Sequence, residues 1–271
     1  QLLRPDGTNG RIRDSWLVDF NEDGQLDLFQ AGGNSSGPLT VWLGDGTGHF
    51  ELTESVGVVA SVSPSDDLFT DIDGDGHLDF VYATGGNGNY TSDDAVIYAG
   101  RRDDLVDLIP IDLNGDGNEE ILAVQEQMDR LQIFVGDNLG GLTRQPDLQT
   151  GRAPKAVAVG DLNGDGQVEL FTANRASRTL DVFVGNLENG YTQTEFAVGT
   201  GPIDVESSDL DNDGNIDVAV LDDAENALWI FSGDGKGALS EPIAIPLGDR
   251  PERFVIADVD GDGDDDAVIT L

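Results

Sequence analysis

Short apolar runs, separated by glycine-rich and acidic turns, follow one another along the whole chain. The segment from 153 to 198 shows this pattern in full, because small and polar residues punctuate four apolar runs as hairpins require. No segment keeps a helical period. The pattern predicts an all-β chain, and the strands expected in this segment are APKAVAVG (153–160), LFTAN (170–174), TLDVFVG (179–185) and YTQTEFAV (191–198).

The third of these strands recurs along the chain, each time with a glycine after it. Its apolar residues stand at consecutive positions, which indicates that both faces of the strand are buried. Such burial fits sheets that pack face to face around an axis. The copies are VWLG (41–44), VIYAG (96–100), IFVG (133–136), VFVG (182–185) and IFSG (230–233).

An acidic nine-residue loop also recurs six times, between the first and second predicted strands. In chain order, loops 1 to 6 are Asp19–Asp27, Asp71–Asp79, Asp112–Glu120, Asp161–Glu169, Asp209–Asp217 and Asp258–Asp266. Their first residues are 52, 41, 49, 48 and 49 positions apart. A period of this size with four strands matches one blade of a β-propeller. The predicted single domain has repeat units at about 11–60, 61–107, 108–150, 151–200, 201–248 and 249–271, plus an N-terminal strand at 1–10.

The loops follow the pattern D-x-[DN]-x-D-G-x-x-[DE], and a G-D-G-x-G-x-[FL] turn stands downstream of them. Together these motifs resemble the FG-GAP or VCBS repeat of integrin-alpha-type propellers, over essentially the whole chain. The resemblance implies a propeller of four-stranded antiparallel blades that bind calcium and recognise a ligand on the face away from the loops. The turn stands here as GDGTGHF (44–50) and GDGKGAL (233–239), with looser forms at 136–142 and 185–191.

The sixth unit is incomplete, because only 13 residues follow Asp258. Three alternatives remain open. The ring has about six blades with a thin last blade, to which residues 1–10 add a strand; or the chain is part of a seven-bladed or larger protein; or a neighbouring molecule completes the open end, since an unpaired edge strand invites pairing.

The chain is strongly acidic, with a formal net charge of −39 from 53 acidic and 14 basic residues. Self-repulsion of this size calls for cations, and it makes nucleic acid and anionic membranes poor partners. Of the acidic residues, 21 occupy side-chain ligand positions in the six loops, so six bound Ca²⁺ ions would bring the charge to −27. The lack of cysteine excludes disulfides and thiolate zinc sites, and no apolar run has the length of a membrane span.

The loops suit calcium, which prefers six to eight oxygen ligands in a flexible arrangement. Side-chain oxygens are expected from positions 1, 3, 5 and 9 and a backbone carbonyl from position 7, while glycine at position 6 permits positive φ. The alternative is an Asx-rich turn without metal. From loop 1 to loop 6, the predicted ligands are Asp19, Asn21, Asp23, Gln25, Asp27; Asp71, Asp73, Asp75, His77, Asp79; Asp112, Asn114, Asp116, Asn118, Glu120; Asp161, Asn163, Asp165, Gln167, Glu169; Asp209, Asp211, Asp213, Asn215, Asp217; and Asp258, Asp260, Asp262, Asp264, Asp266.

Basic residues gather at the opposite end of the predicted blades. They are candidates for an anionic or hydroxyl-rich ligand, or else they offset local carboxylates. Trp229 stands where other units have Thr40, Gln132 and Asp181, so it is either a stacking platform for a sugar or a packing residue. The basic candidates are Arg130, Arg152, Lys155, Arg175, Arg178, Arg250 and Arg253.

These features favour a secreted or cell-surface binding or adhesion module that structural calcium stabilises, with a glycan or an extracellular protein as partner. No catalytic residue is predicted, because many of the acids belong to the loops and His49 and His77 lie in turns at the calcium end. The main alternative is a structural subunit of a fibre, layer or larger secreted protein, which forms a homo-oligomer through the last blade. A polysaccharide lyase or hydrolase is a weaker alternative. Neither nucleic-acid binding nor membrane insertion is expected.

Overall fold

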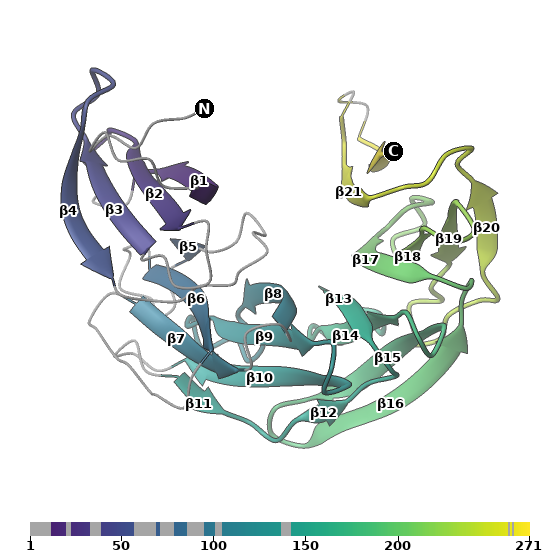
Figure 1. The fold of residues 1–271 in the computed structure, drawn as a ribbon. Coiled ribbons are helices and arrows are strands. Elements are labelled where there is room, and N and C mark those ends of the chain that lie inside the picture. Colours follow the sequence, from purple (N-terminus) through teal and green to yellow (C-terminus); the bar gives the residue numbers. More distant parts are fainter. Residues whose placement is uncertain are drawn as a thin grey trace. The chain divides into compact units, whose positions relative to one another are not determined.

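The computed structural model describes residues 12–19, 23–32, 39–56, 69–70, 79–85, 95–100, 105–136, 142–259, 261 and 263–271. Every regular element in these segments is a β-strand (Figure 1). No helix long and apolar enough to cross a membrane occurs among them. The chain divides into two compact units, one made of Gln1–Leu105, Gly117–Glu119 and Val135–Thr143, the other of Val106–Asp116, Glu120–Phe134 and Arg144–Leu271.

Two sheets belong to the first unit. The first sheet is antiparallel, in the order β1-β2-β3-β4, and consists of β1 (Ile12–Val18), β2 (Asp27–Gly32), β3 (Leu39–Gly44) and β4 (Phe50–Val56). The second contains β5 (Phe69–Thr70), β6 (Asp79–Gly85) and β7 (Ala95–Gly100). Here β6 pairs with β5 antiparallel but with β7 parallel. The parallel pair departs from the predicted antiparallel meander, because neighbouring parallel strands need a crossover connection instead of a hairpin.

Four further sheets follow along the chain, and their adjacent strands pair in chain order. The third sheet is β8 (Leu105–Ile111), β9 (Glu120–Gln125), β10 (Arg130–Gly136) and β11 (Leu142–Arg144), with β12 (Leu148–Gln149) also paired to β10. The fourth is β13 (Pro154–Gly160), β14 (Glu169–Asn174), β15 (Thr179–Asn186) and β16 (Gly190–Ala197). The fifth is β17 (Pro202–Ser208), β18 (Asp217–Asp222), β19 (Ala227–Phe231) and β20 (Ile243–Pro246), and the sixth is β21 (Arg253–Ala257) with β22 (Asp266–Thr270).

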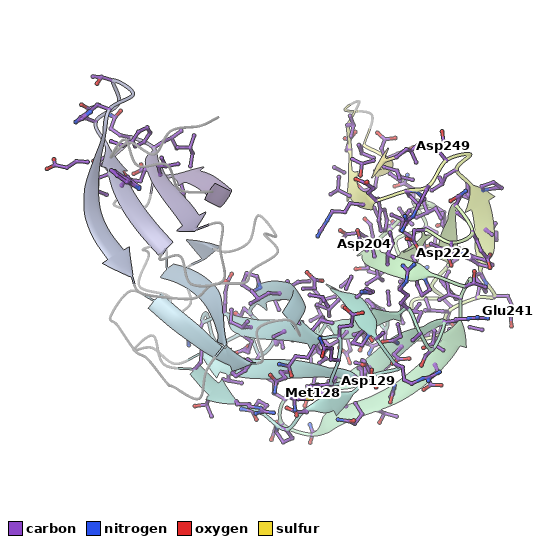
Figure 2. All side chains as sticks on the ribbon, viewed as in Figure 1. Met128, Asp129, Asp204, Asp222, Glu241 and Asp249 are labelled. Atoms are coloured by element: carbon purple, nitrogen blue, oxygen red, sulfur yellow. The ribbon has the colours of Figure 1, made fainter. Side chains whose placement is uncertain are left out.

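Each acidic loop lies between the first two strands of a sheet, as predicted. In the fourth sheet, Asn186 at the end of β15 donates from Nδ2 to Oε1 of Gln167 in loop 4, at 2.7 Å. The turn between the third and fourth strands therefore shares an end with the loop. In the third, fourth and fifth sheets, the turns between second and third strands lie at the other end; Met128 and Asp129 follow β9 there, and Asp222 closes β18 (Figure 2).

In the third, fourth and fifth sheets, the second strand is the most deeply buried. All six residues of β9, β14 and β18 are buried, whereas the outer strand β20 is exposed throughout. A strand that pairs on both edges and is covered on both faces needs apolar residues at consecutive positions. This explains the apolar runs that follow the acidic loops.

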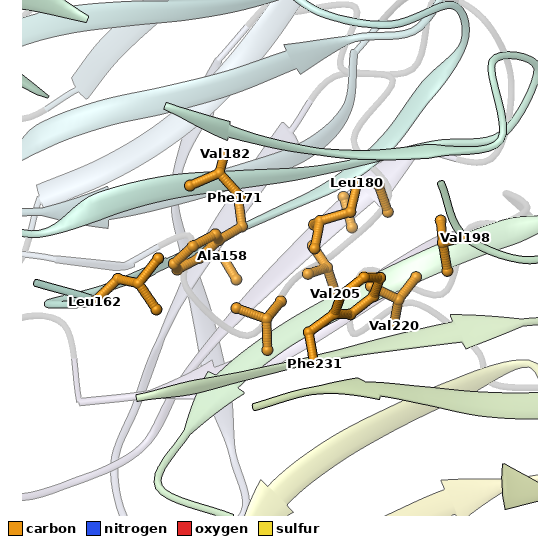
Figure 3. Close-up of a cluster of buried hydrophobic side chains, with 12 residues drawn as sticks. Ala158, Leu162, Phe171, Leu180, Val182, Val198, Val205, Val220 and Phe231 are labelled. Atoms are coloured by element: carbon orange, nitrogen blue, oxygen red, sulfur yellow. The ribbon is translucent and has the colours of Figure 1, made fainter. Parts of the chain in front are cut away.

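Neighbouring sheets in the second unit pack face to face. Phe171 and Val182 of the fourth sheet share a buried cluster with Val205 and Phe231 of the fifth (Figure 3). The rings of Phe196 and Phe231 meet edge to face with centroids 6.0 Å apart, a geometry that aromatic pairs prefer. The same kind of packing joins the third sheet to the fourth and the fifth to the sixth.

First strands also lie beside one another, β13 next to β17 and β17 next to β21. These contacts give the second unit its propeller-like arrangement. The fold class predicted from sequence, an all-β propeller of four-stranded antiparallel blades, is confirmed by several four-stranded antiparallel sheets in a propeller-like arrangement. Trp42, Phe183 and Phe231 are buried, as the apolar third strands predict, whereas Phe134 at the same place in the third sheet is half-buried. The last sheet has two described strands, and its Val255 and Val268 are 55% and 45% exposed.

Candidate calcium loops

Glycine at loop position 6 has the positive φ that the sequence predicts. An added Cβ would meet no atom within 4 Å at any of the five described copies, so the requirement comes from the backbone and not from crowding. The φ values are 84° at Gly24, 89° at Gly117, 85° at Gly166, 87° at Gly214 and 95° at Gly263. Gly76 of loop 2 lies outside the described residues.

Loop 4 shows how the backbone holds the ligand side chains. Asp161 accepts N–H groups from Gly164 at 2.7 Å and from Gly166 at 2.9 Å, one on each carboxylate oxygen. Asp165 accepts the N–H of Gln167 at 2.8 Å. These bonds curl the loop around its own carboxylates, which is the local geometry that Asx turns supply. Loop 3 repeats the first bond, from Gly115 N–H to Asp112 at 2.7 Å.

In loops 3, 4 and 5, position 9 ties the end of the loop to its start. Glu169 Oε2 accepts the N–H of Leu162 at 2.8 Å, and Glu120 Oε2 accepts the N–H of Leu113 at 2.9 Å. In loop 5, Asp217 accepts N–H groups from Leu210 at 3.1 Å and from Gly233, after β19, at 2.8 Å. Position 9 therefore holds the loop to the second strand, and in loop 5 to the third as well.

Loop 5 brings three acidic side chains together. One carboxylate oxygen from each of Asp209, Asp211 and Asp217 lies within 4.8 Å of the other two. Asp217 is buried, Asp209 is half-buried and Asp211 is exposed. Like charges held this close repel one another unless a cation lies between them. The donor set consists of oxygens alone, which suits Ca²⁺.

Loops 1 and 6 are described in part. In loop 1, Asp19 Oδ2 accepts the N–H of Gly24 at 2.9 Å, while Asp19 Oδ1 is buried and has no hydrogen-bond partner. A buried oxygen of this kind is costly unless something binds it. In loop 6, Asp258 accepts the N–H groups of Gly261 and Gly263. The predicted ligands Asn21, Asp71, Asp73, Asp75, His77, Asp260 and Asp262, and the side chain of Asp79, lie outside the described part of the structure.

The electrostatics at position 9 match those of a cation site. Burial raises the pKa of Glu120 to about 7, and the neighbouring Asp112 and Asp116 carboxylates add to this rise. Burial also raises the pKa of Glu169 and of Asp217, again with contributions from nearby loop carboxylates. A bound dication would act in the opposite sense, because it favours the ionised form. The residues present therefore fit calcium.

A model of the FG-GAP-like repeat matches residues 19–82, 112–172 and 209–269, well over half of the chain. The chain belongs to the FG-GAP-like repeat family. Each match begins at the first residue of an acidic loop, so the repeats and loops 1, 3 and 5 are in register. No curated protein sequence matches the chain.

Solved structures of β-propeller-like proteins resemble the FG-GAP-like chain in fold. A protein of unknown function from Desulfotomaculum acetoxidans is 17% identical, with a TM-score of 0.53 over 88% of this chain and 70% of that one. BBS1N, solved in complex with ARL6DN, is 13% identical, with a TM-score of 0.53 over 95% and 75%. A Lactobacillus plantarum protein is 16% identical, with a TM-score of 0.50 over 84% and 71%. At these identities the likeness concerns the fold alone.

In loops 3 and 4, the apolar residue at position 2 also anchors the loop, which the sequence interpretation did not include; in loop 6 the equivalent Val259 is 64% exposed. The side chain of Leu162 is fully buried in the core between the fourth and fifth sheets. Its carbonyl accepts the N–H of Gly237, in the turn before β20, at 3.2 Å. Loop 4 therefore contacts the GDGKGAL turn of the next repeat. The signal was present in the sequence, since every copy carries an apolar residue here: Phe20, Ile72, Leu113, Leu162, Leu210 and Val259.

The predicted basic ligand residues lie at the ends of the sheets away from the loops, and several pair with carboxylates. Arg130 contacts Asp147 at 2.7 Å, and Lys155 contacts Glu126 at 2.7 Å. Arg175 contacts the buried Asp223 at 2.7 Å, and Arg250 binds the other oxygen of the same carboxylate. Arg152, Arg178 and Arg253 are exposed.

Trp229 packs against the core between the fourth and fifth sheets and is only partly exposed. Its Nε1 is buried without a hydrogen-bond partner. A Cβ added to Gly199 would lie 2.9 Å from that nitrogen, so the backbone of Gly199 covers the indole edge. This position agrees with the packing alternative for Trp229.

Proposed function

We propose that this protein is a non-catalytic, extracellular binding module in which calcium stabilises the loops of an FG-GAP-like repeat fold. The observation that carries the proposal is the convergence of Asp209, Asp211 and Asp217 on one point in loop 5. The buried and unpartnered Asp19 Oδ1 in loop 1 supports it independently. Bound calcium would supply charge neutralisation and cross-linking, and no reaction step.

The partner, a glycan or an extracellular protein, binds in this proposal at the end of the blades opposite the loops. Arg152 and Arg178 support that assignment because both are exposed there. Ser177 Oγ accepts the N–H of Arg152 at 2.7 Å, which holds this connection against the turn that carries Arg178. Loops fixed on a rigid sheet are common places for binding residues.

Calorimetric unfolding in millimolar CaCl₂ and in EDTA tests the calcium part of the proposal. When the free calcium concentration is 100 times the Kd of a site, binding at that site adds about 2.7 kcal/mol to the free energy of unfolding. Several sites should therefore raise Tm by many degrees. An identical Tm in calcium, magnesium and EDTA would remove calcium from the proposal. Nearly all-protein oxygen cages favour Ca²⁺ over Mg²⁺, so magnesium should protect less.

A glycan array probed with and without calcium tests the partner class. Binding to acidic glycans that Arg152→Ala and Arg178→Ala reduce together would support the glycan assignment. Glycan binding that survives both substitutions would place the ligand elsewhere. If no glycan binds, the proposed partner becomes a protein, and crosslinking at these two positions is the next measurement.

A structural subunit is the second candidate, because apolar side chains are exposed on the two-stranded sheet. Val255 on β21 is 55% exposed, and Val268, its cross-strand partner on β22, is 45% exposed. Exposed apolar residues gathered in one place commonly mark an interaction site. Light scattering over a range of concentrations distinguishes the candidates, since a fibre or layer subunit should form homo-oligomers and a monomeric binding module should not.

A further inference from the structure

The described loops differ in how positions 3 and 9 meet. In loop 4, Asn163 Nδ2 donates to Glu169 Oε1 at 2.8 Å, so an amide hydrogen bond joins the two positions. Loop 3 has the same bond, from Asn114 Nδ2 to Glu120 Oε1 at 3.2 Å. In loop 5 both positions are aspartate, Asp211 and Asp217, and neither side chain has a proton to donate when ionised.

Position 3 makes one further contact that loops 4 and 5 share. Asn163 Oδ1 accepts the N–H of Asp165 at 2.9 Å, and Asp211 Oδ1 accepts the N–H of Asp213 at 3.2 Å. The backbone curl is therefore shared, and the difference lies in the contact across the loop. Among the residues that the structure describes, loop 5 alone gathers three carboxylate oxygens within 4.8 Å of one another.

We infer that the calcium loops form two classes, an inference that rests on the proposed function. Loops 3 and 4 hold their own shape through the Asn–Glu hydrogen bond and bind calcium weakly. Loop 5 carries four aspartates at its side-chain positions, lacks a hydrogen bond between positions 3 and 9, and binds calcium first. Loops 2 and 6 carry the same four aspartates as loop 5 and belong to its class by sequence.

Charge and geometry both separate the classes. At the side-chain ligand positions 1, 3, 5 and 9, loop 5 carries a charge of −4 when ionised, whereas loops 3 and 4 carry −3 each. Calcium affinity rises with the number of charged ligands. The empty form of loop 5 also lacks a donor between Asp211 and Asp217, so binding relieves a repulsion that the Asn–Glu pair does not have. Both effects favour loop 5.

The test exchanges the two sets within the full-length chain. Asp211→Asn with Asp217→Glu gives loop 5 the side chains of loop 4, and Asn163→Asp with Glu169→Asp does the reverse. Calcium titration by isothermal calorimetry should resolve a tight and a weak class in the parent chain. The loop 5 exchange should remove one equivalent from the tight class and weaken it by about tenfold or more. The loop 4 exchange should add one tight equivalent.

Two further variants keep the test decisive. Asp217 is buried and accepts two N–H groups, so the exposed Asp211→Asn alone serves where the double exchange fails to fold. Glu241→Gln removes one exposed carboxylate outside the loops and should leave both classes unchanged. A single affinity class, or equal effects of Asp211→Asn and Glu241→Gln, would overturn the inference while calcium binding itself stands. If the parent chain binds no calcium at all, this result overturns the proposed function instead.

Discussion

Asp107 joins two neighbouring sheets through hydrogen bonds. Its titration should make the free energy of unfolding depend on pH, and the substitution Asp107→Asn should remove this dependence. Asp107 lies in β8, and its Oδ2 accepts the N–H of Val157, in β13 of the next sheet, at 2.8 Å. Its Oδ1 accepts the N–H of Leu108 at 3.0 Å. Asp204 in β17 is the same position of a later repeat and accepts the N–H of Phe254, in β21, at 3.4 Å.

The pKa of Asp107 is raised from 3.8 to about 6, because the carboxyl is buried and the Asp204 charge adds to the effect. The hydrogen bond from Val157 and the charge of Arg253 oppose the rise. A folded-state pKa above the unfolded one means that the folded state holds the proton more tightly. The resulting stability is fully present below about pH 4 and is lost as the pH rises through about 6.

The size of this loss follows from the two pKa values. The interval from 3.8 to about 6 corresponds to about 3 kcal/mol, at 1.36 kcal/mol for each pH unit. Asp107→Asn removes the titration but keeps one oxygen for the N–H of Val157. It gives up the second acceptor, which costs about 1 kcal/mol at every pH. The variant should therefore be less stable than the parent near pH 4 and more stable by about 2 kcal/mol near pH 8.

Urea unfolding at constant calcium, from about pH 4 to pH 8, measures the difference between variant and parent. Taking the difference cancels the titration of the loops and of the surface carboxylates, which both proteins share. Glu195→Gln on the exposed strand β16 is the control and should give a flat difference. A flat difference for Asp107→Asn as well would refute the assignment of a raised pKa to this side chain.

Three further substitutions test the fold and the opposite end. Gly166→Ala should lower the free energy of unfolding in urea by about 1–2 kcal/mol, because φ is 85° at this position. The site has room for a Cβ, so an unchanged midpoint would show that the positive φ carries no strain. Phe231→Ala should cost about 3–5 kcal/mol, because the ring is fully buried between two sheets, whereas the exposed Ile243→Ala should change little. Asp223→Asn should cost on the order of 1 kcal/mol, since Arg175 and Arg250 hold the pKa of this carboxyl below its ordinary value; equal stability of variant and parent in low salt would argue against the pairing.

The repeat pattern was sufficient to predict the four-stranded antiparallel sheets, because each of their strands is set by local features. A run such as LFTAN follows an acidic loop and is buried on both faces, and β14 (Glu169–Asn174) includes it entirely. Positive φ at position 6 was predicted for the same reason, since a tight backbone curl leaves glycine as the residue without strain. Side-chain identity and spacing are enough wherever the interacting groups lie within one loop.

Contacts between repeats were harder to predict from sequence. Asp107 accepts a hydrogen bond from Val157, fifty positions later in the chain. The ion pair of Arg175 with Asp223 likewise depends on the packing of the fourth sheet against the fifth. Trp229 appeared unusual because its equivalents are polar, yet its surroundings are set by Gly199 in the preceding connection. The parallel pairing of β6 with β7 has no sequence signal in the strands themselves.

The position-9 side chain explains why the loops matter beyond their own nine residues. In loop 5, one oxygen of Asp217 holds Leu210 within the loop and the other holds Gly233 behind the third strand. In loop 1, Asp27 accepts the N–H of Gly44 at 2.9 Å in the same way. Because the proposed cation and these N–H groups share one carboxylate, each should favour its ionised form and strengthen the other. Calcium at loop 5 would therefore stabilise the pairing of three strands, and its removal should loosen β18 and β19 before it affects the core between the fourth and fifth sheets. Hydrogen exchange in EDTA would show this as faster exchange at the Gly233 amide than at the Val205 amide, and uniform loss of protection would argue against a local role.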